Sequence, residues 1–519
     1  MSLSDLGNPQ QLIKRFKRAQ KEYDEWRALH QETFDFIMPD RESFNQHSPG
    51  KARNRHIFDA TATMAIEQFA SRIRGAVIPS WRQWAELAPG SIVPPDEKAN
   101  IAQELEKRTD IVFNALNHSN FYSEINPALI DLGVGTGGII MDEGEFNSGT
   151  LLNFTNVPLS ELYPEKPPSG RIRSAWRKHE MALSKIEQVY PGAKLPKELQ
   201  DKAKNNPDAE ETLLNGQLFN PKDGRYYHVI LHEGSKALLF DQSFATQRFI
   251  VFRWSVVKGE TFGRGPAIQV LPDVKTLNKI VQFKLEALAL AVGGLYTAVN
   301  DGVFNPNTVQ LRPKTIIPVG SNNSQNPTLQ PLQLGGDPTS VELTVRELQD
   351  RINKTFFANV IGEITDPVRT ATENMIRQQE MLKQAGASFG RLRSELIEPL
   401  LAGLLDILAG LGQLPEQLIV DGSAVTIKHT SPQAKSEDLE DFQNFQTWAA
   451  TNIELVGPEV FQGTTKVEDF PKRTAEMLGV SPALIRTPEE IQALGEAAQQ
   501  AAQQQLAAQE VPQGAQPTE

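Results

Sequence analysis

The chain has 519 residues, enough for about three compact units, and 39% of them are hydrophobic and 22% charged, as in globular proteins. Its formal net charge of −12 argues against a protein that grips nucleic acid over a broad basic face, but not against one that lets DNA slide past. There is no cysteine, which excludes disulfides, thiolate catalysis and cysteine metal ligands. The start of the chain lacks the apolar core of a signal peptide, and the longest strongly apolar stretch, 285–296, is shorter than the ~20 residues of a membrane helix. We therefore expect a soluble protein.

The first half of the chain has the pattern of an α+β region. Apolar residues recurring at spacings of three and four predict helices at 10–38, 60–78 and about 96–117. Runs with β character predict strands from 138 through 153 and at 226–231, 237–240 and 248–256. Between these strands, the residues 183–201 have a helical pattern and 202–208 have that of a polar loop.

The second half is mainly helical. The breaker Gly263-Arg264-Gly265-Pro266 predicts the start of a long helix that runs to about Val292 and bends at Pro272. Turn-forming residues fill 295–337. A capping box that starts at Thr339 then predicts a returning helix to about Asn359.

A second capping box, which starts at Thr370, predicts the longest helix. This helix should run to about Leu411 and kink at Pro399. A β-like segment follows at 418–429, and the remainder is helical, ending in an alanine- and glutamine-rich tail that is either a solvated helix or a disordered extension.

One glycine cluster raises the question of a nucleotide site. In Gly133-x-Gly135-x-Gly137-Gly138 the glycines could cradle a phosphate, but a phosphate loop must follow a strand and open a helix. Here a helical stretch ending near Leu132 comes first and a strand follows, and the lysine and hydroxyl residues of a Walker motif are missing. We predict a helix-to-strand turn.

The histidines and carboxylates do not form a recognisable catalytic or metal site. His228 and His232 lie four apart on a predicted strand, which places them about 13 Å apart, too far to share a metal. Asp142, Glu143 and Glu145 form an acidic cluster near a turn; a paired-carboxylate hydrolase is conceivable, but with no assignable His, Lys or Arg partner a solvated turn is favoured. No G-x-S-x-G nucleophile elbow occurs. We expect no enzyme activity, no catalytic residue, no metal and no cofactor.

The basic opening 14–18, Lys-Arg-Phe-Lys-Arg, could touch DNA. Glu22, Asp24 and Glu25 follow on the same helix and balance it, so we interpret the run as a solvated face.

The order of these elements resembles the portal, or head-to-tail connector, proteins of double-stranded-DNA bacteriophages, and two segments narrow the resemblance to short-tailed phages (podoviruses). The first segment is similar to the family's early helix with its following proline and aromatic: Phe58-Asp59-Ala60-Thr61 through Ala70, Ile78-Pro79 and Trp84. The second is similar to the family's long-helix signature: Thr370-Ala371-Thr372-Glu373, Arg377, Glu380, Phe389, Arg391-Leu392, Glu395-Leu396 and Pro399-Leu400. The element order matches over nearly the whole chain.

The resemblance implies an α+β, mainly helical portal fold with wing, stem, clip and crown, assembled as a cyclic ring of twelve subunits (a dodecamer). The expected parts, in chain order, are the wing 1–262, a stem helix 263–292, the clip 293–337, a returning stem helix 338–361, a tunnel loop 362–369, a long kinked wing helix with a β segment 370–435, and a helical crown with its tail 436–519.

Two sets of residues would then face DNA. On the first stem helix, at 100° per residue, Lys275, Lys279, Gln282 and Glu286 fall within about one sixth of the circumference. They would line the channel, unless this polar stripe merely faces outside solvent. The apolar residues gather on another side: Leu271, Val274, Leu277, Val281, Leu285 and Leu288.

The second set is the tunnel loop, Gly362-Glu363-Ile364-Thr365-Asp366-Pro367. Its two acidic residues, repeated around a ring, would keep DNA centred by repulsion over a screening length of ~8 Å. The alternative is an ordinary surface turn between helices.

The resemblance also implies a function and partners. The protein would form the channel at one capsid vertex through which viral DNA is packaged and later ejected, and onto which the tail docks. Its partners would be further copies of itself, the terminase large subunit, tail adaptor proteins, scaffold, capsid and internal core proteins, and transiently held double-stranded DNA, with no membrane. It would reside in the virion after assembly in the host cytoplasm. The alternatives are another virion structural protein, such as a tail tube or internal core protein, and a packaging enzyme, which the missing phosphate loop disfavours.

Overall fold

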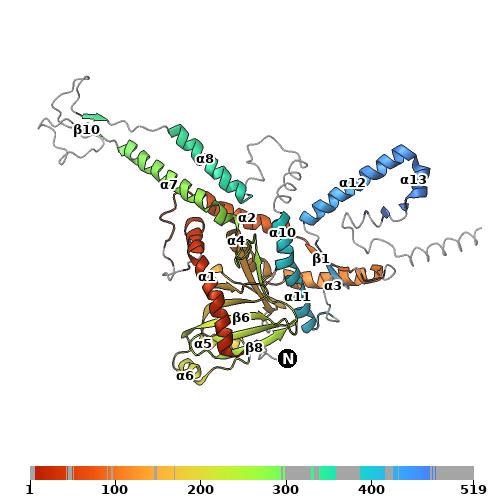
Figure 1. The fold of residues 1–519 in the computed structure, drawn as a ribbon, viewed down its shortest axis with the longest axis horizontal. Coiled ribbons are helices and arrows are strands. Elements are labelled where there is room, and N and C mark those ends of the chain that lie inside the picture. The colour runs from red at the N-terminus through yellow and green to blue at the C-terminus, as the bar shows by residue number, and fades with distance from the viewer. Residues whose placement is uncertain are drawn as a thin grey trace, which may run out of the picture.

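The computed structural model describes residues 6–41, 44, 50, 52–90, 92–94, 98–144, 149–168, 170–293, 296–298, 329–331, 338–357, 386–414, 425–429, 432–467, 470–471 and 474. Within these ranges helices and sheets are mixed, and a body of both kinds carries a projecting pair of helices (Figure 1). The α+β class is therefore confirmed.

The first helix, α1 (Pro9–Ile37), begins at a capping box. The side chain of Asn8 accepts a hydrogen bond from the backbone N–H of Gln11, and the side chain of Gln11 accepts one from the backbone N–H of Asn8, each at 2.9 Å. One side of the helix is buried against the body: Leu12, Ile13, Phe16, Ala19, Tyr23, His30, Thr33, Phe34 and Ile37. The predicted helix is confirmed, although its cap was not recognised in the sequence.

Three further helices complete the N-terminal helical layer: α2 (Thr61–Val77), α3 (Lys98–Asn117) and α4 (Phe121–Val134). The predictions for the first two are confirmed to within a few residues. Proline 127 lies inside α4.

Two antiparallel sheets form the rest of the body. In the smaller sheet, β2 (Thr136–Glu143) lies between β3 (Leu152–Asn156) and β9 (Phe249–Arg253). In the larger sheet the order follows the chain: β4 (Leu162–Pro164), β5 (Ala175–Ala182), β6 (Glu210–Phe219), β7 (Tyr226–His232) and β8 (Leu238–Phe244). A short 3-10 turn, η2 (Leu159–Glu161), precedes β4.

The segment around β5 and β6 differs from the prediction. The single helix expected at 183–201 is two helices, α5 (Leu183–Val189) and α6 (Lys197–Asn205), separated by a stretch with two prolines and a glycine. The expected loop at 202–208 is wrong in its first half, because α6 continues to Asn205. Strand β6 was missed because polar Asn215 and Gln217 interrupt its apolar run, although both are buried.

The projecting pair consists of α7 (Pro266–Gly293), with Pro272 inside it as expected, and α8 (Pro338–Thr355). The two helices run antiparallel: Asp273 pairs with Arg351 at 3.4 Å, and farther along α7 Lys284 pairs with Glu342. Beyond their outer ends, β10 (Tyr296–Ala298) pairs with β11 (Leu329–Pro331) (Figure 1). The other residues of the expected clip lie outside the described ranges.

The long helix predicted to 411 is described from Gly386 onward. It comprises α10 (Gly386–Leu392), a π-helical turn η4 (Arg393–Ile397) and α11 (Glu398–Gly410). The π-turn ends at Ile397, two residues before Pro399, the residue expected to disturb the helix. A proline has no N–H and its ring collides with the carbonyl four residues earlier, so a wider turn relieves both problems.

The C-terminal elements are β12 (Val425–His429), α12 (Pro432–Val456) and α13 (Pro458–Thr464). Strand β12 pairs with β1 (Ala85–Pro89), which joins the predicted β segment to the N-terminal half of the chain. One hydrophobic core includes side chains from α1, α2, α4, the smaller sheet, the base of α7 and α11.

Candidate functional site

The two glycine motifs of the sequence meet at the base of the projecting helices. A Cβ atom on Gly135 would lie 2.0 Å from the carbonyl oxygen of Gly263, and one on Gly265 would lie 2.2 Å from that of Gly133. The backbone N–H of Gly265 donates to the carbonyl of Val134 at 2.8 Å. Only glycine permits backbones to cross this closely, and this glycine crossing fixes where α7 begins.

The structure also shows what the first glycine motif, 133–138, is. Helix α4 ends at Val134 and strand β2 begins at Thr136, so the motif is the predicted helix-to-strand turn. Its backbone groups face another chain segment: the carbonyl of Gly135 accepts from the N–H of Trp254 at 2.9 Å, and Thr136 Oγ1 accepts from the N–H of Gly263 at 2.8 Å.

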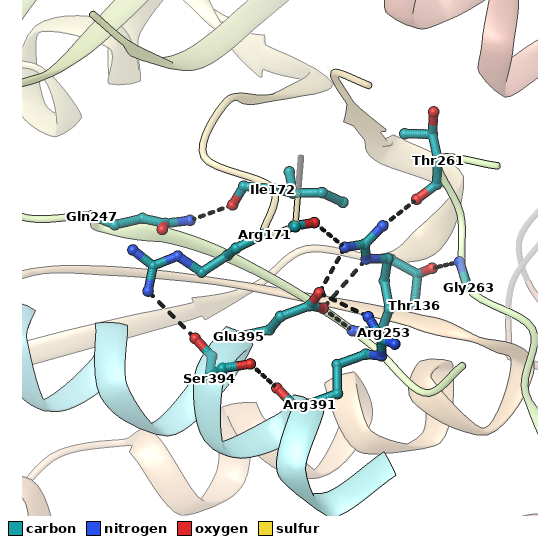
Figure 2. Close-up of polar contacts among 11 residues, drawn as sticks. Thr136, Arg171, Ile172, Gln247, Arg253, Thr261, Gly263, Arg391, Ser394 and Glu395 are labelled. Atoms are coloured by element: carbon teal, nitrogen blue, oxygen red, sulfur yellow. Dashed lines mark hydrogen bonds and ion pairs between the residues drawn. The ribbon is translucent and has the colours of Figure 1, made fainter. Parts of the chain in front are cut away.

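A buried ion pair joins the smaller sheet to the π-turn (Figure 2). The Nη2 atom of Arg253, on β9, lies 2.6 Å from Oε1 of Glu395, and the backbone N–H of Arg253 donates to Oε2 at 2.9 Å. The arginine also donates to the carbonyls of Gly170, at 2.9 Å, and Thr261, at 3.3 Å. The two side chains are 1% and 3% exposed, and such a pair is strongly destabilising when only one partner is removed.

Aromatic rings pack around Trp254, the next residue. The ring of Phe69 on α2 lies 5.1 Å away between centroids, that of Phe357 6.3 Å and that of Phe389 on α10 6.4 Å. This Trp254 cluster therefore holds the chain both where α8 ends and where α10 begins. The expected tunnel loop lies between these two points.

The end of α8 is held in an uncommon backbone conformation. Phe357 has φ of +56°, a region that phenylalanine seldom adopts, and its carbonyl accepts a hydrogen bond from the guanidinium of Arg72 on α2. Partial burial lowers the pKa of Arg72. The direction in which the chain leaves α8 is thus set by described residues, whereas the predicted loop Gly362–Pro367 itself lies outside the described ranges.

Three of the four residues in the predicted polar stripe on α7 are linked by hydrogen bonds. Lys279 donates to Gln282 at 3.1 Å, and Gln282 donates to Glu286 at 2.8 Å. Lys275 differs from the others: it pairs with Glu32 of α1, and its ammonium lies 5.7 Å from the ring centroid of Phe36. The structure therefore separates Lys275, which pairs with α1, from the three residues farther out on α7, and whether these face a channel stays a prediction.

The described residues of the acidic cluster and both histidines have neighbours within the body. Asp142 and Glu143 are the last two residues of strand β2, within the strand expected from 138 onward, and they have a basic neighbour, because Nη1 of Arg248 lies 3.5 Å from Oε1 of Glu143. Burial raises the pKa of Asp142 to about 6, although the charge of Arg248 opposes this. Glu145 lies outside the described residues.

His228 and His232 are both on β7, as expected. His228 Nε2 lies 2.7 Å from Asn215 Oδ1, and burial lowers the pKa of His228 to about 4. His232 Nε2 instead lies 3.1 Å from Glu211. In the described part of the chain no three histidine, aspartate or glutamate side chains converge as a metal site would require, and none of its helices combines the length and apolar character of a membrane span.

The sequence did not reveal the residues that hold the region where α7 and α8 meet the body: Arg72, Arg253, Trp254 and Phe357. Glu395 was part of the long-helix signature, but its partner is 142 residues earlier in the chain and no local pattern signals it.

Comparison with known proteins gives a consistent result. Residues 9–485 match the family model described as bacteriophage head to tail connecting protein. The chain is 21% identical over 513 residues to the probable portal protein of Bordetella phage BPP-1, covering 91% of this chain and 88% of that protein. It is 22% identical over 514 residues to the portal protein of Salmonella phage epsilon15, covering 94% and 90%. The resemblance inferred from the sequence is confirmed, and the chain belongs to the family of bacteriophage head-to-tail connecting proteins.

Proposed function

We propose that this chain is the portal subunit of a phage capsid: copies of it form a closed ring at one vertex, viral DNA enters and leaves through the ring, and the tail docks on it. The observation that carries the proposal is the antiparallel pair α7 and α8, which projects from a base fixed by the glycine crossing, in a chain that matches the family over 9–485.

The parts of the chain would have the roles expected from the sequence. Residues 1–262 would be the wing, 263–292 and 338–361 the two stem helices, 293–337 the clip and 362–369 the tunnel loop. The long helix and β segment, 370–435, would brace the wing, and 436–519 would form the crown. The base geometry supports this division, because the glycine crossing, the Arg253–Glu395 pair and the Trp254 cluster all lie where wing, stem and long helix meet.

Within the stem, Lys279, Gln282 and Glu286 are the candidates to face DNA. Hydrogen bonds between them hold the charges in a mixed row, which would offer a passing phosphate backbone little net attraction. Weak attraction suits a conduit, because every tight phosphate contact would slow the DNA. In the tunnel loop, Glu363 and Asp366 would act by repulsion, as expected from the sequence.

A channel at a capsid vertex would also have defined partners. The ring would contain twelve copies and be a virion component. It would meet the terminase motor and tail adaptors at the clip, and scaffold, capsid and internal core proteins at the wing and crown. It would assemble in the host cytoplasm, need no cofactor and catalyse no reaction. DNA would be held only transiently and without regard to sequence.

A charge reversal in the stem tests the channel. We expect Lys279→Glu to leave ring assembly intact, seen in negative-stain images, and to change the retention of packaged DNA, measured as the fraction of particles that keep a full genome. Lys258→Glu, an exposed lysine outside the stem, is the matched control and should change neither. Normal retention in the Lys279 variant would contradict the channel role, and the absence of rings in the unmodified protein would favour another virion structural protein.

The tunnel loop needs a separate variant. Deleting 363–366 should leave rings intact and impair packaging or retention. A deletion variant that packages and holds a full genome at the normal rate would reduce the loop to a connector.

A further inference from the structure

Helix α1 exposes a row of four cations on one face. Lys14, Lys17, Arg18 and Lys21 are spaced i, i+3, i+4 and i+7, so they lie along the same side of the helix, and all four are exposed. None of them has a carboxylate within 4.0 Å among the described residues. Arg15, the remaining cation between residues 14 and 21, turns toward the body and pairs with Glu165 at 2.6 Å.

The acidic residues that follow do not neutralise this row. Glu22 accepts a hydrogen bond from Thr261, so its carboxylate is turned toward the body. Asp24 and Glu25 are exposed farther along the helix, and neither forms an ion pair with the row in the described part of the chain. The like charges at i and i+4 disfavour the helix, as does positive charge near its N-terminal end. The face is solvated, as interpreted from the sequence, but in the described part of the chain the acidic residues do not pair with these cations.

The opposite side of α1 fixes the direction in which the row points. The ring of Phe16 lies 5.3 Å from that of Tyr163 and 5.9 Å from that of Trp176, and Tyr23 donates to the carbonyl of Ser160 at 2.9 Å. The capping box at Asn8 fixes the start of the helix. The four cations are thus presented on a rigid support over the larger sheet.

The composition of the row selects the kind of partner. Protein interfaces are depleted in lysine at their centre and rely on aromatic and other large apolar anchors. This row is three lysines and an arginine, and no large apolar side chain lies exposed among them. Lysine and arginine rows without apolar anchors suit the phosphates of a nucleic acid backbone, which are contacted through charge and without sequence preference.

The row lies apart from the stem. Helix α1 meets α7 through Glu32, which pairs with Lys275, and Glu32 is about 16 Å farther along the helix axis than Lys21. Figure 1 shows α1 running from the base of α7 across the larger sheet. DNA that passes through the proposed channel is therefore not the DNA that this row would touch.

We propose that Lys14, Lys17, Arg18 and Lys21 form a site on the outer wing surface that binds the backbone of double-stranded DNA without sequence preference, separately from the channel. With only four charges the binding is weak and falls steeply with salt. Such a site would contact DNA that lies against the wing.

Covalently closed circular DNA separates this site from the channel, because a closed circle cannot thread through a closed ring. The full-length protein is compared with K14Q/K17Q/K21Q and with the control K185Q/K194Q/K197Q, which removes the same charge from three exposed lysines elsewhere on the body. We expect the first variant to bind closed circles roughly tenfold or more weakly and to reduce the slope of log K against log salt by about 2–3. The control should match the unmodified protein.

Three results would overturn the proposal. Equal weakening in both triple variants would show a general charge effect, and unchanged binding in the first would show that the row does not contact DNA. If the first variant instead loses its oligomeric state by size-exclusion chromatography, the row is a contact between copies of the chain. Threading of linear DNA, measured on the same preparations, reports on the channel independently, so failure of this site leaves the proposed function untouched.

Discussion

The two halves of α7 contain similar residues in opposite surroundings. From Ala267 to Leu277 the apolar side chains are buried against the body, apart from the partly buried Ile268, and Leu277 is only 1% exposed. From Phe283 onward the described side chains are exposed, and Leu285 and Leu288 are 47% and 56% exposed. Helix α8 repeats the gradient, with Ile352 fully buried near the base and Leu343 58% exposed farther out.

The difference shows which part of the helical pair makes its contacts within one chain. At the base the apolar side chains are buried, the glycines allow close backbone contact, and Arg253 and Glu395 pair with each other. The outer half exposes leucines at the spacing that a packed helix would bury, and large exposed apolar patches mark sites of association. We expect the base to set the stability of the chain and the outer half to act in assembly.

The largest effect should come from the glycine crossing. In Gly135→Ala or Gly263→Ala the new Cβ would meet a backbone oxygen, at 2.0 or 2.3 Å, that no side-chain movement can relieve. We expect a loss of at least ~3 kcal/mol in the free energy of unfolding, or no folded protein, by urea denaturation. Gly410→Ala is the control, since its Cβ would meet open space in a helix. Equal stability of the crossing and control variants would contradict the close contact.

The buried ion pair should come next. Arg253→Met leaves the buried Glu395 carboxylate with only the partly exposed Arg391, 3.6 Å away, as a cationic neighbour, and should cost about 3 kcal/mol of unfolding free energy. The double variant Arg253→Met/Glu395→Met should recover much of this loss, because no unpaired charge remains. Arg264→Gln, which breaks the more exposed pair with Glu260, should cost less than about 1 kcal/mol. Additive losses in the double variant would show that the pair does not act as a unit.

Acid should weaken the body through His30. The side chain is 1% exposed among aromatic rings, and burial lowers its pKa to about 3. Between the unfolded pKa near 6.5 and the folded value, the unfolded chain binds the proton and the folded chain does not, so stability falls as pH falls. From pH 6.5 to pH 5 this group should cost about 2 kcal/mol.

The pH effect has a direct control. His30→Leu should make the dependence of unfolding free energy on pH shallower in this window, with the buried His228 still contributing, whereas His118→Gln, a substitution at an exposed histidine, should not. An undiminished slope in His30→Leu would assign the acid sensitivity to other groups.

The smallest effect on unfolding should come from the outer half of α7. Leu285→Ser/Leu288→Ser should change the unfolding free energy of the separated chain by less than ~0.5 kcal/mol, because both side chains are already exposed. The same variant should lower the fraction of assembled protein in native mass spectra. Unimpaired assembly would mean that the exposed leucines do not lie between subunits.

Local patterns in the sequence predicted the helices well and the base poorly. The bounds of α1, α2 and α7 follow from apolar spacing and prolines, which act within a few residues. Strand β6 was missed because Asn215 and Gln217 are buried through hydrogen bonds to distant residues, Gln217 to the carbonyl of Phe249 at 3.0 Å.

The candidate site shows the same limit. The two glycine motifs were visible in the sequence, but their contact joins residues about 130 positions apart, and the Arg253–Glu395 pair spans 142. Neither contact has a local signal. The polar stripe of α7 was visible from its spacing, yet the attachment of Lys275 to Glu32 depends on how α1 packs, which periodicity does not report.

One measurement tests the proposed channel most directly: an electron cryomicroscopy reconstruction of the purified, assembled full-length protein. We expect a closed ring in which Lys279, Gln282 and Glu286 of every copy face the central opening, with Leu285 and Leu288 packed between neighbouring copies. A ring with the three polar residues on its outer surface, or a protein that forms no ring at all, would contradict the proposal that this stem conducts DNA.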